Sequence, residues 1–121
     1  MRQTPASRKA NETLRDKVAS VILFQVADPR LQMVTITACE VSTDRSVADV
    51  YVSADKERYE EVLAGLEAAK GRIRSLVGKE LGWRVTPELR FRIDKSVDTA
   101  EHIAAVLESE QKWLDSITQE Q

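Results

Sequence analysis

The chain has 121 residues, of which 42% are hydrophobic and 31% charged, and a formal net charge of −2, a balance typical of one folded domain. The longest apolar run, residues 21–24, is too short to cross a bilayer, and no secretory signal is recognisable, so we expect a cytoplasmic protein without membrane contact. With one cysteine and one histidine, the sequence forms neither an intrachain disulfide nor a Cys/His zinc site.

The first half of the chain predicts a helix followed by a β-hairpin. Residues 8–27 carry apolar side chains at helical spacing, and the Asp-Pro pair at 28–29 ends this helix because a residue before proline is disfavoured in the α conformation. Residues 33–41 are rich in β-branched side chains, and residues 47–53 alternate between apolar and polar, so each segment predicts a strand. The polar residues 42–46 suit the turn of an antiparallel hairpin.

The second half predicts a helical region, a third strand and a final helix. Residues 57–82 keep one helical phase, but all four glycines fall within them, so a break at Gly71 would divide the segment into a helix pair. Leu89, Phe91 and Ile93 then alternate with arginines in a strand that Arg84 enters. The resulting α+β order is α-β-β-α-α-β, with one domain over residues 1–97 and an acidic amphipathic helix with a frayed tail over residues 98–121.

Catalytic residue patterns are absent from the sequence. It has no glycine-rich phosphate loop and no Gly-x-Ser-x-Gly elbow. Cys39 and His102 are a possible nucleophile and base, but no motif brings them together, and we interpret them as a small buried strand residue and a solvated or capping residue. We therefore expect a non-enzyme without cofactor or metal.

Positive charge concentrates in residues 70–95, which carry eight basic and three acidic side chains, whereas residues 96–121 carry one basic and six acidic. Guanidinium groups make paired hydrogen bonds to phosphates, so this segment predicts contacts with an RNA backbone. Aromatic support is thin, with Tyr51 and Trp83 the candidates near such a surface. In an alternative interpretation, the arginines of the third strand pair only with nearby carboxylates. The predicted RNA-binding residues are Lys70, Arg72, Arg74, Lys79, Arg84, Arg90 and Arg92.

Five short motifs, in order along residues 8–107, resemble the ribosome-binding factor A family of bacterial small-subunit assembly factors. The motifs are Asp28-Pro-Arg-Leu31 with Val34-Thr-Ile-Thr37, Val41-Ser42, Val50-Tyr-Val-Ser53, Ala69-Lys-Gly71 with Ile73-Arg74, and Thr86-Pro-Glu-Leu-Arg-Phe91 with Asp94-Lys-Ser96. Each motif is weak alone, but the five together in this order are specific.

The resemblance implies a KH-like domain, type II-like in its αββααβ order, in which a helix kink at Ala69-Lys70-Gly71 replaces the usual GXXG loop. It also implies a non-enzymatic factor that binds the free 30S subunit and assists late maturation and processing of 16S rRNA, alongside late-assembly GTPases. Such a factor matters for cold adaptation, and we expect it to act as a monomer. The alternative is a protein–protein adapter that binds through the acidic C-terminal helix.

Overall fold

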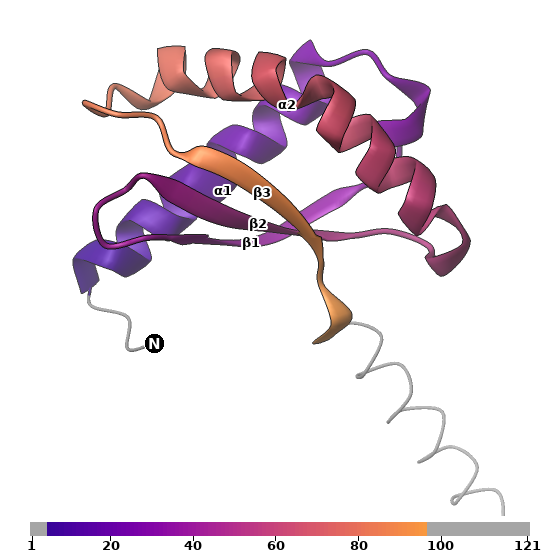
Figure 1. Ribbon diagram of the computed structural model, residues 1–121, viewed down its shortest axis with the longest axis horizontal. Coiled ribbons are helices and arrows are strands. Elements are labelled where there is room, and N and C mark those ends of the chain that lie inside the picture. Colours follow the sequence, from indigo (N-terminus) through magenta and orange to yellow (C-terminus); the bar gives the residue numbers. More distant parts are fainter. Residues whose placement is uncertain (1–4, 97–121) are drawn as a thin grey trace, which may run out of the picture.

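In a computed structural model of the chain, which describes residues 5–96, two helices pack on a three-stranded sheet (Figure 1). The α+β class and the three-stranded sheet predicted from sequence are thereby confirmed. The elements in chain order are α1 (Pro5–Gln25), the 3-10 turn η1 (Pro29–Leu31), β1 (Thr35–Val41), β2 (Val47–Ser53), the 3-10 turn η2 (Lys56–Arg58), α2 (Tyr59–Leu81) and β3 (Glu88–Ile93).

The sheet has the strand order β1-β2-β3. β1 and β2 form the predicted antiparallel hairpin, and β3 pairs parallel to β2 along its other edge. A bulge interrupts β1 between Ile36 and Ala38. The hydroxyl of the bulge residue, Thr37, donates to Asp94 Oδ2 at 2.7 Å and so ties β1 to the residue that follows β3.

The core lies between the helices and one face of the sheet. Ala48, Val50 and Val52 of β2 are fully buried, whereas Asp49 and Tyr51 between them lie on the other face, which we call the open face. Burying one such aliphatic side chain contributes about 1.5–3 kcal/mol, and this drives the helices onto the sheet. The predicted apolar stripes of both helices supply the remaining layer, with Leu14, Val18, Val21 and Ile22 from α1 and Val62, Leu66, Ile73 and Val77 from α2.

The prediction that this segment forms two helices is wrong, because residues 59–81 form one continuous helix. Gly71 lies near its middle without a break, and Figure 1 shows α2 changing direction about midway along its length. Glycine costs about 1 kcal/mol in a helix interior, but burial of Ile73 and Val77 on the following turns outweighs that cost. Gly82 ends α2 with φ of 67°, as expected for a C-terminal stop.

Other boundaries differ from the prediction at irregular backbone. β1 begins at Thr35 instead of residue 33, because Met33 has a φ of 61° that no strand residue adopts. The third strand begins after Pro87, so Arg84 lies in the preceding loop and does not enter the strand. The predicted C-terminal helix, residues 98–121, lies outside the described residues, as does His102.

Candidate nucleic-acid interface

The basic side chains of α2 fall on its exposed surface, where their partners differ. Lys70 Nζ lies 3.5 Å from a carboxylate oxygen of Glu67, one turn earlier. Arg72 reaches across to α1 and donates from Nη2 to the carbonyl oxygen of Gln25 at 3.3 Å. Lys79 is exposed near the end of the helix and has no ion pair with any residue that the structure describes. Lys79 is therefore the least engaged of the basic residues on α2.

Arg74 fastens the loop between α2 and β3. Its Nη2 donates to the carbonyl oxygen of Thr86 at 2.7 Å, and its Nε donates to the carbonyl oxygen of Pro87 at 3.2 Å. A Cβ at Gly78 would lie 2.6 Å from Thr86 Oγ1, so the loop also passes very close to the helix backbone. Arg74 thus has a structural role that the sequence did not reveal, and its predicted RNA contact stays a prediction.

Two of the predicted arginines lie on the open face and share one carboxylate. Asp49 Oδ1 accepts from Arg90 Nε at 3.0 Å and from Arg92 Nε at 3.1 Å. The parallel register sets Asp49 beside Arg90, while Arg92 is the neighbour of Tyr51. The alternative interpretation, pairing with a nearby carboxylate, therefore describes these contacts correctly. Both arginine side chains remain about half exposed, at 51% and 53%, and one negative charge opposes their two positive charges.

Several basic residues lie at one end of the molecule, and only some of them are among the seven predicted RNA-binding residues. The β1–β2 turn and the α2–β3 loop lie at the same end of the molecule (Figure 1), joined by a hydrogen bond of 2.9 Å from the Glu88 amide to the Ser46 carbonyl. Here the Arg45 guanidinium lies over the indole ring of Trp83, 4.6 Å from its centroid. Arg84 is exposed beside Trp83.

The contact of Arg45 with Trp83 was missed by sequence reasoning. It joins residues 38 positions apart, and no local spacing signals it. The sequence offers one clue, which is that the α2–β3 loop carries an aromatic ring beside an arginine. We refer to Arg45, Lys79, Trp83 and Arg84 as the Trp83 corner.

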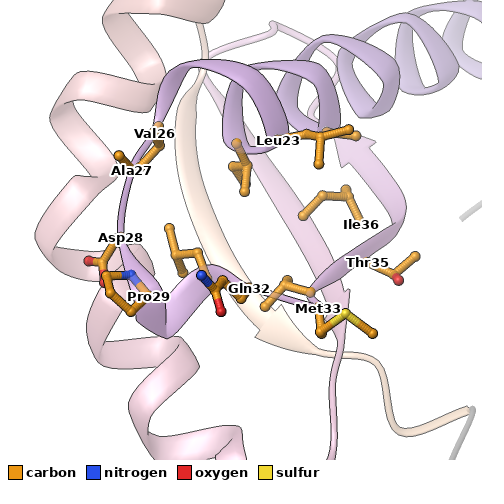
Figure 2. Close-up of a pocket in the computed structure, with 13 residues that line it drawn as sticks. Leu23, Val26, Ala27, Asp28, Pro29, Gln32, Met33, Thr35 and Ile36 are labelled. Carbon is orange, nitrogen blue, oxygen red and sulfur yellow. The ribbon is translucent and has the colours of Figure 1, made fainter.

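An apolar groove lies on another side of the molecule, where the end of α1 and η1 meet the start of β1 (Figure 2). It encloses about 790 Å³. Leu23 and Met33, which line the groove, are 73% and 87% exposed, and neighbouring Phe24 is 77% exposed. The Asp28 carboxylate closes the adjoining turn by accepting from the Arg30 guanidinium at 2.8 Å, and this contact lowers the pKa of Asp28. The groove is thus a largely apolar surface whose lining includes no cationic side chain, and it does not suit a phosphate backbone.

The structure offers no assembled catalytic or metal site within residues 5–96. Cys39 is buried in the sheet, and burial raises the pKa of its thiol to about 12, so it is no nucleophile at neutral pH. No group of three His, Cys, Asp or Glu side chains is placed to hold a metal ion in this part of the chain. The helices that the structure describes are also too short or too polar to span a membrane.

Comparison with known proteins gives one family. The profile described as Ribosome-binding factor A matches residues 6–107. The Ribosome-binding factor A of Moorella thermoacetica is 36% identical over 111 residues, which cover 88% of this chain and 91% of that protein. The Salinispora tropica protein of the same name is 42% identical over 102 residues; these cover 83% of this chain but only 65% of the Salinispora protein, which is less than two thirds of its length.

Solved structures agree with the sequence match. The crystal structure of ribosome-binding factor A from Thermus thermophilus has a TM-score of 0.67 and 31% identity, covering 72% of this chain and 94% of that one. A homology model of the Thermus thermophilus factor, fitted into the cryo-EM map of a 30S complex of that factor, gives a TM-score of 0.61 and 32% identity, covering 70% and 91% of the two chains.

Proposed function

The chain belongs to the ribosome-binding factor A family, and from this membership we propose that it is an assembly factor that binds the free 30S ribosomal subunit through its rRNA. The observation that carries the proposal is the exposed positive charge on α2 and the loop that follows it, in which Lys79 and Arg84 have no carboxylate partner among the described residues. A related protein was fitted into a map of a 30S complex, which supports the same partner.

The proposal includes finer features of the family resemblance. The order α-β-β-α-β and the change of direction about midway along α2 support a KH-like domain that presents this helix to rRNA, and we propose that the bend lies at Ala69-Lys70-Gly71. We propose that the factor acts as a monomer without catalysis, late in 16S rRNA maturation and processing, in company with assembly GTPases and above all in the cold. Lys70, Arg72, Lys79 and Arg84 are the side chains we propose to face the rRNA backbone.

Co-sedimentation with purified 30S subunits, 50S subunits and 70S ribosomes at several salt concentrations tests this function. We expect selective pelleting with free 30S subunits and a binding constant that falls with salt, by a log–log slope of about 0.7 to 0.9 for each phosphate contacted. Failure to pellet with 30S subunits at any salt would refute the function. A slope near zero would show that the contact does not depend on the phosphate backbone.

Charge reversal then locates the surface. Lys79→Glu with Arg84→Glu is preferable to any change at Arg74, because the side chains of Lys79 and Arg84 make no hydrogen bond within the described structure, whereas Arg74 fastens a loop. We expect the double variant to lose 30S binding while its melting temperature stays within about 2 °C of wild type. Retained binding would place the interface elsewhere.

A truncated chain distinguishes the assembly-factor function from the adapter function. We propose that residues 1–97 are the RNA-binding domain and that residues 98–121 form an acidic helix outside it. A chain ending at residue 97 should then keep most of its affinity for 30S subunits. Loss of a protein partner on this truncation, in a protein whose full-length chain does not pellet with 30S subunits, would instead favour the adapter, which acts through the acidic segment.

A further inference from the structure

We propose that Arg45, held against the ring of Trp83, is a phosphate-binding residue for the RNA backbone. This inference rests on the proposed function and adds to it a contact on the β1–β2 turn, outside the basic segment of residues 70–95. Four observations carry it: the backbone of Arg45, the turn around it, the stacking contact and the neighbouring charges.

Arg45 occupies a backbone conformation that suits other residues better. Its φ is 60°, in the left-handed region, where glycine and asparagine are favoured. Among the described residues, Met33 is the one other non-glycine residue with a positive φ. An arginine therefore stands where glycine or asparagine would fit with less strain, and strained backbone positions cluster at functional sites.

The turn itself does not need the Arg45 side chain. The Asp44 carboxylate accepts from the hydroxyls of Ser42 and Ser46 at 2.8 and 2.7 Å and from the Ser46 amide at 3.1 Å. These hydrogen bonds lower the pKa of Asp44. The Arg45 amide donates to the Ser42 carbonyl at 2.9 Å, a contact that any residue other than proline would make. The turn is thus closed by its serines and Asp44, and the guanidinium is left for another use.

Trp83 holds that guanidinium in place. The indole is partly buried against the hydrophobic core, and the Arg45 Cζ lies 4.6 Å from its centroid. An arginine stacked on an aromatic ring uses the face of its planar group, so the N–H donors around its edge stay available to a phosphate. Arg45 forms no salt bridge or side-chain hydrogen bond within the described part of the chain. The stacking therefore orders the guanidinium before RNA arrives and reduces the entropy lost on binding.

The remaining cations of the Trp83 corner come from α2 and from the loop that follows it. Lys79 lies at the end of α2 and Arg84 in the following loop, and both are exposed. Arg74 fixes that loop through the carbonyl oxygens of Thr86 and Pro87. Arg45, Lys79 and Arg84 thus supply three exposed cations from three segments, the β1–β2 turn, α2 and the α2–β3 loop, and each can contact a phosphate.

The test compares Arg45→Asn with wild type in 30S co-sedimentation and in binding to a fluorescein-labelled oligouridylate. Asparagine fits the left-handed backbone, so thermal unfolding should be unchanged or shifted upward. We expect affinity to fall about tenfold and the log–log salt slope to shrink by about 0.7, the value for one lost phosphate contact on a single strand. Lys56→Asn is the matched control, because it removes an exposed cation at the other end of β2 and should change neither quantity by as much.

Changes at Trp83 test the stacking. Trp83→Phe keeps an aromatic face and should bind nearly as wild type, whereas Trp83→Leu should weaken binding in wild type but hardly further in Arg45→Asn. If Arg45→Asn binds with unchanged affinity and slope while wild type pellets with 30S subunits, the inference is wrong and the proposed function stands. If wild type itself does not bind 30S subunits, both fall.

Discussion

At the scale of single residues, Cys39 shows how the fold disables a reactive group. Its side chain is 3% exposed and pairs across the sheet with Val50. Burial disfavours the thiolate and raises the pKa of Cys39 to about 12. The prediction of a small buried strand residue is confirmed, and the thiol packs as a hydrophobic group.

The raised pKa of Cys39 predicts a loss of stability in alkaline solution. Above about pH 8.5 the unfolded chain releases the thiol proton while the native chain keeps it, so the native state binds more protons and the free energy of unfolding decreases as pH rises. We expect a decrease of about 1.2 kcal/mol from this group between pH 9 and 10, because the unfolded thiol is not yet fully ionised at the start of this range. Urea unfolding of wild type and Cys39→Ala across this range measures it. Parallel profiles for the two proteins would contradict the prediction.

At the scale of the element, the glycines of α2 have different reasons to be there. A Cβ at Gly65 would lie 3.0 Å from Arg30 Cβ and 3.1 Å from Leu31 Cδ2, so this glycine lets η1 pack directly on the helix. Gly78 does the same for the loop at Thr86. Gly71 meets nothing within 4 Å and has no positive φ. Nothing within the described fold requires glycine at position 71, which leaves the bend of α2 as its candidate role.

Alanine at Gly71 and at Gly78 should therefore act in opposite directions. Gly71→Ala should raise the free energy of unfolding by about 0.5–1 kcal/mol, because alanine has the higher helix propensity and its Cβ enters open space. Gly78→Ala should lower it by about 1–3 kcal/mol, because the Cβ would lie 2.6 Å from Thr86 Oγ1 and displace the loop. Thermal unfolding of both variants tests this pair. A Gly71→Ala variant that melts below wild type would show that the glycine is needed for the native backbone.

At the scale of the whole molecule, the elements predicted correctly are those whose apolar side chains recur at the spacing of a strand or of a helix. The alternation of Ala48, Val50 and Val52 gave the second strand, and the helical spacing from Leu14 to Ile22 gave the first helix. The parallel pairing of β3 depends on contacts between distant segments, and no local pattern specifies it. The predicted break at Gly71 was wrong because helix propensity contributes less to the stability of α2 than the burial of its side chains in the core.

The candidate site, too, could be predicted only where its signal is local in the sequence. Local sequence identified where cations are concentrated, but not which of them are already engaged. Arg74 binds carbonyl oxygens 12 and 13 residues away, and Arg90 binds a carboxylate 41 residues away. These partners exist only once the chain has folded. The cations without an ion pair are therefore distributed differently from the basic residues as a whole, and among the described residues they include Arg45, Lys79 and Arg84 of the Trp83 corner.

The open face provides a test of this distribution. Asp49 is the shared partner of Arg90 and Arg92, so Asp49→Asn should leave two guanidinium groups without a charged partner. We expect its stability to fall by less than about 1 kcal/mol, as is usual for exposed ion pairs. If the open face contacts rRNA, affinity for 30S subunits should rise and the salt slope should steepen by about 0.7 to 0.9 for each phosphate gained.

Glu40→Gln is the matched control for this experiment. Glu40 pairs with Asp49 across β1 and β2 and is exposed, but it forms no salt bridge with a described residue. Both substitutions remove one negative charge from neighbouring positions, so a general effect of net charge would be the same in the two variants. A larger gain for Asp49→Asn requires that Arg90 and Arg92 reach RNA once released. Equal gains in the two variants would confine the interface to α2 and the Trp83 corner, because the arginines of β3 would then contribute only through the overall charge.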